Sequence, residues 1–299
     1  MRKEAKNTIL TSMVNFSLNP VKWWREKCSC KRVPVVSVVR LSGVIGASGG
    51  VRGLSNALDI ASVADSLERA FSVRHVKAVA VIINSPGGSP VQSAMIYRRI
   101  RALSEEKDVP VFAFAEDVAA SGGYMLACAG DEIYADESSV IGSVGVISAG
   151  FGFTALLEKL GVERRIHATG PNKGMLDPFQ PEDPAHVGRL TAIQGDIYEV
   201  FTTLVCERRG KRLKSEDDDL FSGAFWAGRR ALALGLIDGI GDMREVMREK
   251  YGEKVRFLVV NRARSWRQRL GLTLGTAFGD ELLTSLEASR LWSRFGIWR

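Results

Sequence analysis

The sequence has 299 residues, 45% of them hydrophobic, and its 41 Lys and Arg against 34 Asp and Glu give a net charge of +7. This length and composition predict a globular chain with a substantial core and exclude a disordered or fibrous protein. The positive charge is concentrated at the ends: residues 1–33 hold eight Lys and Arg and two Asp and Glu, and residues 261–299 hold seven and three. The intervening chain is slightly acidic, which argues against a nucleic-acid-binding protein and favours termini that meet an acidic surface.

The termini are predicted to be basic, amphipathic extensions, residues 1–32 and 262–299, around one domain at 33–261. No stretch reads as a transmembrane helix of about 20 apolar residues. The four scattered cysteines are too few for a disulfide framework and favour a reducing compartment. We therefore expect a cytoplasmic protein whose extensions contact the inner face of an anionic membrane, with solvated tails or packing on a neighbouring subunit as alternatives.

From residue 33 onward, buried strand patterns alternate with helical ones, which is typical of βαβ units on a mostly parallel sheet. Gly and Pro in residues 169–184 predict a long loop, after which Asp183 and Pro184 begin a long helix that reaches about Arg209. We expect the strands at residues 35–39, 78–83, 111–115, 133–135, 144–148 and 255–260. The other helices are expected at residues 60–71, 91–103, 121–129, 227–234 and 243–250.

A glycine-containing turn, NSPGGSP, follows the second expected strand at residues 84–90. Ligands of open α/β sheets bind at this position, outside the carboxyl ends of the strands. The adjacent Gly87 and Gly88 can turn their N–H groups outward with no side chain in the way, as donors to an oxyanion do. An ordinary strand-to-helix turn is the alternative. The pattern matches neither a dinucleotide fingerprint nor a phosphate loop.

A serine stands at the equivalent place after the third strand. Ser121, in the stretch AASGGY, precedes a helix whose dipole would stabilise negative charge nearby. The alternative is an ordinary N-cap. A nucleophilic serine also needs a proton acceptor. None of the three histidines, His75, His167 and His186, has a neighbourhood typical of a triad, although folding could bring one close.

A lysine is the other candidate for the proton acceptor. Burial can lower a lysine pKa from about 10.4 toward neutrality, and an uncharged lysine can deprotonate a serine. Lys173 lies in the Gly/Pro loop with no acidic residue within three positions on either side. The carboxylate of Asp177, four positions away, would oppose such a shift if it pointed toward the lysine. An exposed loop lysine without a catalytic role is the alternative.

Taken together, the segments NSPGG, AASGGY, GSVGV, GPNKGMLDPF and GLIDGIG, in this order, resemble peptidase family S49, the signal peptide peptidase A type of Ser-Lys protease. The resemblance covers roughly residues 33–260, and the lysine follows the serine by 52 residues, as in bacterial members with a single repeat. It implies an α/β fold with a ClpP/crotonase-like βαβ spiral core and a mostly parallel sheet.

The resemblance also implies the roles of the site residues. Ser121 would be the nucleophile, Lys173 the general base, and Ser143 the residue that orients the lysine amine. An uncharged partner suits this role, because a carboxylate would favour the protonated lysine. The resemblance implies no metal and no cofactor. The oxyanion-hole donors would be the N–H groups of Gly88, with Gly87 or Gly122.

The function implied is that of an ATP-independent serine endopeptidase that cleaves signal-peptide remnants or other unfolded, apolar peptides through an acyl-enzyme. Family members assemble into homo-oligomeric rings or domes, in which the Ser and Lys of one site can come from adjacent subunits. The chain differs from the family pattern in two ways that bear on localisation. Many bacterial relatives have an N-terminal membrane anchor, where this chain has the basic, amphipathic residues 1–32, and this chain also has the extra residues 262–299.

Two other functions are compatible with parts of the pattern. A crotonase-like acyl-CoA hydratase or isomerase uses a similar fold and a glycine-supported oxyanion hole, but it needs carboxylates there, and these segments supply Ser and Lys. A catalytically silent scaffold that binds peptides or membranes is the third possibility, and the presence of both Ser121 and Lys173 argues against it.

Overall fold

The computed structural model of the protein describes residues 33–46, 57–214, 218–260 and 292–295. Within these ranges the chain forms an eight-stranded sheet in which every pair of strands is parallel except β5 with β6. The hydrogen-bonded order is β6-β5-β3-β2-β1-β8, and β4 pairs with both β3 and β7. The strands are β1 (Val35–Ser42), β2 (Val76–Ser85), β3 (Val111–Ala120), β4 (Glu132–Ala135), β5 (Val140–Gly142), β6 (Phe225–Ala227), β7 (Gly239–Ile240) and β8 (Arg256–Val259).

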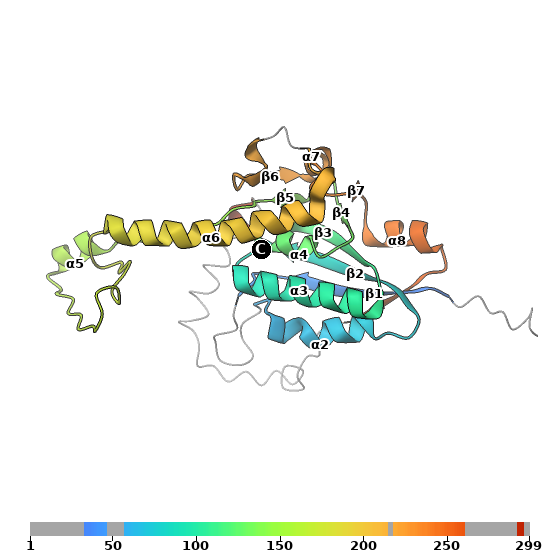
Figure 1. Ribbon diagram of the computed structural model, residues 1–299, viewed down its shortest axis with the longest axis horizontal. Coiled ribbons are helices and arrows are strands. Elements are labelled where there is room, and N and C mark those ends of the chain that lie inside the picture. Colours follow the sequence, from blue (N-terminus) through green and yellow to red (C-terminus); the bar gives the residue numbers. More distant parts are fainter. Residues whose placement is uncertain (1–32, 47–56, 215–217, 261–291, 296–299) are drawn as a thin grey trace, which may run out of the picture. The chain divides into compact units, whose positions relative to one another are not determined.

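Both faces of the sheet are covered, so its central strands carry apolar residues at successive positions. In β2, Val79, Val81 and Ile83 pack into the larger core, and Ala78 and Ala80 into the smaller one. The helices α2 (Ile60–Phe71), α3 (Pro90–Lys107) and α4 (Gly122–Ala127) lie together on the larger-core side, and α8 (Met243–Tyr251) contributes to the smaller core (Figure 1).

The remaining helices are α5 (Thr154–Leu160), α6 (Pro184–Arg209) and α7 (Gly228–Leu234), with short 3-10 turns at Gly210–Arg212 and Asp218–Phe221. The last part of α6 runs beside α4 and buries Phe201, Val205 and Arg209 (Figure 1). In contrast, α5 buries no residue, and residues 150–200 are exposed or half-buried throughout. This segment therefore has an extensive surface that the described chain does not cover.

The expectation of an α/β core with a mostly parallel sheet is confirmed, and each predicted helix is present within a few residues of its expected bounds. The strand predicted at residues 144–148 is wrong. The strand that pairs with β3 is β5, and it ends at Gly142 because Gly142 and Ser143 have φ of 112° and 54°, outside the β region. An apolar run that follows Ser143 had the composition of a strand, but it has no strand partner within the described residues.

The four described residues near the C-terminus pack on the sheet. Trp292 and Phe295 are buried against Val118 and Ala120 of β3, and the Phe295 ring lies 5.1 Å from that of Phe225. The extension that includes Trp292 was expected to contact a membrane, with solvated tails or packing on a neighbouring subunit as alternatives; Trp292 itself is covered by the chain's own residues. The rest of the predicted extensions, residues 1–32, 262–291 and 296–299, lies outside the described residues.

Among the described helices, none combines the length and the apolar character needed to cross a lipid bilayer.

Candidate active site

Ser121 occupies a strained turn between β3 and α4. Its backbone has φ 53° and ψ −123°, a combination that a residue with a side chain adopts only where its surroundings hold it there. The Ser121 N–H donates to the Gly142 carbonyl at 2.8 Å, which ties the turn to β5. The Ser121 side chain makes no capping hydrogen bond to α4. The hydroxyl is therefore not used as an N-cap, and strain of this kind is typical of functional residues.

A bulge in β3 directs the strand toward this turn. The pairing of β2 with β3 shifts register beside Asn84. The Asn84 side-chain amide donates to Asp117 at 2.6 Å, and its oxygen accepts the Val118 N–H at 3.4 Å. Bulges bend a strand and re-aim the residues beyond it. Asn84 therefore helps to place Ser121, a role that the sequence did not reveal.

The turn that contains Gly87 lies directly against Ser121. Gly87 has φ 99°, and a Cβ atom at this position would lie 2.8 Å from both the Ser121 Cβ and the Gly122 nitrogen. A side chain here would collide with the turn that contains Ser121. Glycine is therefore required at position 87 for the two turns to meet.

Gly88 is held on its other side by the segment that follows β1. The Ile45 N–H donates to the Gly87 carbonyl at 2.8 Å, and the Ser89 N–H donates to the Ile45 carbonyl at 2.7 Å. In this parallel bridge the N–H and C=O of Gly88 itself face away from Ile45. No hydrogen bond of the Gly88 N–H is found within the described residues, so this donor is available.

A second free donor belongs to Gly122. It is the first residue of α4, and the N–H groups of a first helical turn have no acceptor within the helix. A Cβ atom at Gly122 would lie 2.3 Å from the Ser93 Oγ on α3, so the helix start is packed closely. The structure thus places Gly87 and Gly122 beside Ser121, and Gly88 follows Gly87 in the same turn.

Ser143 directly follows β5, the strand that pairs with the end of β3. Ala120 and Gly142 are paired in the parallel β3–β5 ladder, so Ser121 and Ser143 are the next residues of the two strands. Both have positive φ, and Ser143 is 2% exposed. The Ser143 N–H donates to the Ala224 carbonyl at 2.6 Å, which fixes its backbone.

Lys173 is placed apart from this group. It is exposed, in a series of turns between α5 and α6, where its N–H donates to the Gly170 carbonyl at 3.2 Å. No contact of Lys173 with Ser121 or Ser143 is found within the described residues. One chain therefore assembles the serine and the N–H donors but does not bring the predicted base to them.

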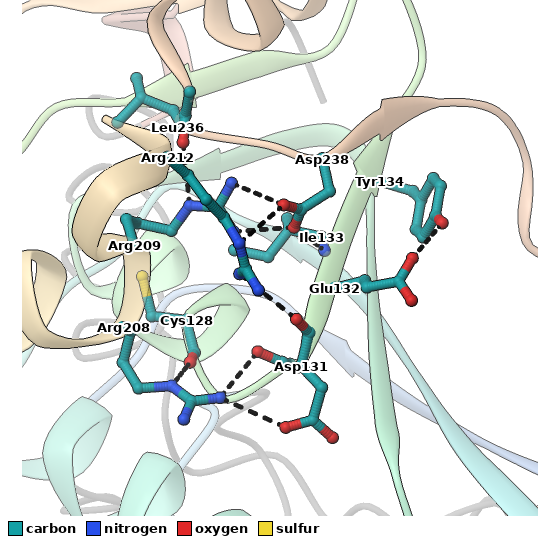
Figure 2. Close-up of polar contacts among 12 residues, drawn as sticks. Cys128, Asp131, Glu132, Ile133, Tyr134, Arg208, Arg209, Arg212, Leu236 and Asp238 are labelled. Atoms are coloured by element: carbon teal, nitrogen blue, oxygen red, sulfur yellow. Dashed lines mark hydrogen bonds and ion pairs between the residues drawn. The ribbon is translucent and has the colours of Figure 1, made fainter. Parts of the chain in front are cut away.

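Two arginines at the end of α6 attach it to neighbouring segments, Arg208 to the residues after α4 and Arg209 to residues 235–238. Neither contact could be predicted from the sequence. The Arg208 guanidinium donates to the carbonyls of Cys128 and Gly130, each at 2.9 Å, just past the end of α4 (Figure 2). The Arg209 side chain is 1% exposed and donates to both oxygens of Asp238, at 2.7 and 3.0 Å (Figure 2). Asp238 also accepts the Ile133 N–H at 2.8 Å. Hydrogen bonds and an ion pair therefore connect the end of α6 to the residues after α4 and to the GLIDG segment, residues 235–239.

The residues around Ser121 give little support for a mechanism based on a thiolate, a metal ion or a histidine. Burial raises the pKa of the Cys128 thiol to about 12, so a thiolate nucleophile is not available there. The part of the chain that the structure describes contains no cluster of three or more His, Cys, Asp or Glu side chains that could hold a metal. His75 lies in the turn before β2, at the opposite end of the parallel strands from Ser121.

A cavity of about 420 Å³ lies over the smaller core, between the sheet and the start of α8. Its lining includes Arg40, Glu116, Asp136, Asp242 and Arg244, but none of the predicted site residues. Arg40 and Glu116 form an ion pair with each other. We therefore assign no part of the serine chemistry to this cavity.

A model of the family described as Peptidase family S49 matches residues 104–255, about half of the chain. The matched range contains Ser121, Ser143 and Lys173. The chain belongs to peptidase family S49. Membership in this family of serine peptidases agrees with the fold class expected from the sequence.

Individual relatives of the chain differ in name. The Na(+)/H(+) antiporter NhaA of Brucella abortus is 49% identical over 274 residues, 88% of this chain and 37% of that protein. Serine protease SPPA, chloroplastic, of Arabidopsis thaliana is 31% identical over 240 residues, 71% of this chain and 35% of that protein. This chain spans little more than a third of these curated relatives, so their names describe longer proteins.

Among solved structures, a mutant of the 1510-N membrane-bound stomatin-specific protease is 16% identical, with a TM-score of 0.45, over 78% of this chain and 95% of that one. The assignment of this chain to family S49 rests on the family match.

Proposed function

We propose that this S49 chain is a serine endopeptidase that works without ATP, with Ser121 as nucleophile and Lys173 as general base. The observation that carries the proposal is the uncapped Ser121 hydroxyl on a strained turn, with the free N–H groups of Gly88 and Gly122 beside it. A nucleophile held close to preorganised donors is the arrangement that acyl transfer requires.

In the first half of the proposed reaction, the uncharged Lys173 amine takes the proton of the Ser121 hydroxyl as Oγ attacks the carbonyl carbon of the peptide. The carbonyl oxygen becomes an oxyanion, which the Gly88 and Gly122 N–H groups stabilise. The tetrahedral intermediate then expels the amine of the peptide, which receives the proton from the Lys173 ammonium, and leaves an ester on Ser121.

In the second half, Lys173 takes a proton from water as the water oxygen attacks the ester carbonyl. The intermediate collapses, the Ser121 Oγ leaves and regains the proton, and the new carboxyl end of the peptide is released. Ser143, which directly follows β5 as Ser121 follows β3, would accept or donate a hydrogen bond to the Lys173 amine and so fix its position in both halves.

The lysine of each site is proposed to come from a neighbouring subunit of a homo-oligomer. Within the described part of the chain Lys173 does not contact Ser121, and the segment that carries it exposes large apolar side chains, which a monomer seldom leaves in contact with water. Seven of these are Ile147, Leu156, Leu160, Ile166, Leu176, Ile193 and Val200. A ring or dome of copies would cover them and complete the sites.

The substrates proposed are unfolded, apolar peptides, such as remnants of signal peptides, that bind in an extended form. The name of the Arabidopsis relative, a serine protease, is consistent with peptide cleavage. Cleavage beside small or apolar side chains is part of the proposal.

The acyl-CoA hydratase alternative would need free carboxylates beside the oxyanion hole. The two carboxylates of β3 closest in sequence to Ser121 are both engaged, Glu116 with Arg40 and Asp117 with Asn84. A catalytically silent scaffold would not require the strained backbone conformation of Ser121. Both alternatives are therefore disfavoured.

Peripheral contact of the basic terminal extensions with an anionic membrane, apart from Trp292 and Phe295, which pack on the sheet, is also part of the proposal, on the basis of their charge. The full chain should sediment with anionic lipid vesicles and be released by salt. Absence from the vesicle pellet at low salt would remove this part.

The test of the catalytic proposal is labelling by a serine-reactive covalent probe together with cleavage of an apolar fluorogenic peptide. Ser121→Ala should abolish both, and Lys173→Ala should reduce both by at least about 10³-fold, because the base is lost. Ser138→Ala and Lys159→Ala change exposed residues of the same types and should leave both intact. Labelling and cleavage that survive Ser121→Ala and Lys173→Ala would exclude the Ser-Lys assignment.

A further inference from the structure

The loop that carries Lys173 contains a buried carboxylate. The Asp177 side chain is 5% exposed, and its Oδ2 lies 3.0 Å from the Arg164 Nε. This oxygen accepts no hydrogen bond within the described residues, whereas Oδ1 accepts the Phe179 N–H at 3.1 Å. Charge compensation at Oδ2 therefore comes from Arg164, since a buried carboxylate is costly without a partner.

The same arginine also holds the loop in place. The Arg164 guanidinium carbon lies 4.6 Å from the centre of the Phe179 ring, in a cation–π contact. The Phe179 ring lies 5.5 Å from that of Phe153, and the Phe153 N–H donates to the Pro178 carbonyl at 2.6 Å, at the start of α5. Arg164 thus joins the end of the Lys173 loop to the helix before it.

Asp177 is the acidic residue nearest to Lys173 in the sequence, and consecutive turns keep this stretch folded. The Lys173 N–H donates to the Gly170 carbonyl, and the Gln180 N–H donates to the Asp177 carbonyl at 3.1 Å. A carboxylate without compensation at this place would favour the charged form of a nearby lysine. An ammonium cannot accept the proton of a serine.

Other charged groups of this region are engaged elsewhere or exposed. On α5 and the stretch after it these are Glu158, Lys159, Glu163, Arg165 and His167, all exposed. Arg165 pairs with Glu163 at 2.7 Å. Neither Arg165 nor Glu163 contacts Asp177 within the described residues.

We propose that Arg164 is a positioning residue for catalysis: it neutralises Asp177 and holds the loop so that Lys173 is presented as an uncharged base. This inference rests on the proposed function, in which Lys173 is the general base. Under this inference a lysine base can lie four residues from an aspartate, because the ion pair with Arg164 compensates the charge of that carboxylate.

The test is the pH dependence of kcat/KM for peptide cleavage by the full chain. In Arg164→Ala the free Asp177 carboxylate should favour the Lys173 ammonium, so the acidic limb of the profile should move about one pH unit upward and activity on that limb should fall about tenfold. In the double variant Arg164→Ala/Asp177→Asn the carboxylate is gone as well, and the limb should return to its wild-type position. Arg165→Ala, a neighbouring arginine that pairs only with exposed Glu163, is the matched control and should keep the wild-type profile.

The double variant distinguishes an effect of the Asp177 charge from a displaced loop. If Arg164→Ala acted only by releasing the loop, the additional change Asp177→Asn would not return the acidic limb of the kcat/KM profile to its wild-type position. A wild-type profile in Arg164→Ala, or a shifted limb that Asp177→Asn fails to restore, would overturn the inference while Ser121 and Lys173 remain assigned. Cleavage that persists in Ser121→Ala or Lys173→Ala would overturn the proposed function, and this inference with it.

Discussion

At the scale of single residues, the site depends on positions where a side chain is missing. The Gly88 N–H is free because the bridge to Ile45 uses the neighbouring groups of Gly87 and Ser89. A Cβ atom at Gly88 would lie 1.9 Å from the Ile45 carbonyl oxygen, which is backbone and cannot rotate away. Any side chain at this position must therefore shift the donor relative to Ser121.

Gly88→Ala should consequently lower kcat for peptide cleavage by about 10²-fold or more, the usual effect of losing one oxyanion donor. KM should change less, because the interaction forms with the transition state. Gly46→Ala is the control nearby, since a Cβ atom there meets nothing within 4 Å. Steady-state kinetics of both variants check this, and wild-type kcat in Gly88→Ala would exclude the Gly88 donor.

The sequence pointed to Gly88 and Ser121 because each follows a buried strand pattern at the carboxyl edge of a parallel sheet. Ser143 came from the family resemblance alone, since the strand was expected after it, at residues 144–148, whereas β5 ends directly before it. Ile45 and Arg164 were not predicted, because each acts through a partner that only the folded chain brings near. Their local sequence contains no motif that marks the contact.

At the scale of elements, α6 connects two parts of the site. It follows the segment that carries Lys173, and its C-terminal end contacts α4, the helix that begins after Ser121. Arg208 bonds to the carbonyls past the end of α4, and Arg209 is buried with Asp238. The Tyr124 hydroxyl on α4 donates to the Leu236 carbonyl at 2.7 Å, in the GLIDG segment. These contacts fix the end of α6 relative to α4, the helix that follows Ser121.

Arg209→Met should destabilise the protein by up to about 3 kcal/mol, because the Asp238 carboxylate loses its two short hydrogen bonds to Arg209 and keeps only the longer contact with Arg212, at 3.5 Å, and the Ile133 N–H. Chemical denaturation of the full chain measures this. Arg229→Met removes a fully exposed arginine that pairs with Glu137 and should change the denaturation midpoint little. Equal midpoints for the two variants would contradict the structural role of Arg209.

The helices were predictable from apolar spacing, but the edge of the sheet near the site was not. Gly142 and Ser143 end β5 through their positive φ, and the short β6 (Phe225–Ala227) pairs with it in antiparallel fashion. A three-residue strand has no periodicity that can be detected, and its pairing is a long-range contact. A strand was wrongly predicted at residues 144–148 because these residues are mostly apolar and the sequence there contains no pattern that clearly predicts a turn.

At the scale of the whole molecule, catalysis by this S49 chain is proposed to be a property of the assembly. One chain holds Ser121 with its N–H donors, and the exposed, apolar segment around α5 carries Lys173 elsewhere. An isolated subunit should therefore be inactive, and activity should depend on contacts between copies.

The most direct measurement is peptide cleavage after Ser121→Ala and Lys173→Ala subunits, each inactive alone, are dissociated and reassembled together. If adjacent copies share each site, an equal mixture should recover up to about a quarter of wild-type activity, because one site in four then pairs an intact serine with an intact lysine. Mixtures that remain as inactive as the separate variants, although they assemble like the wild type, would contradict a site shared between subunits.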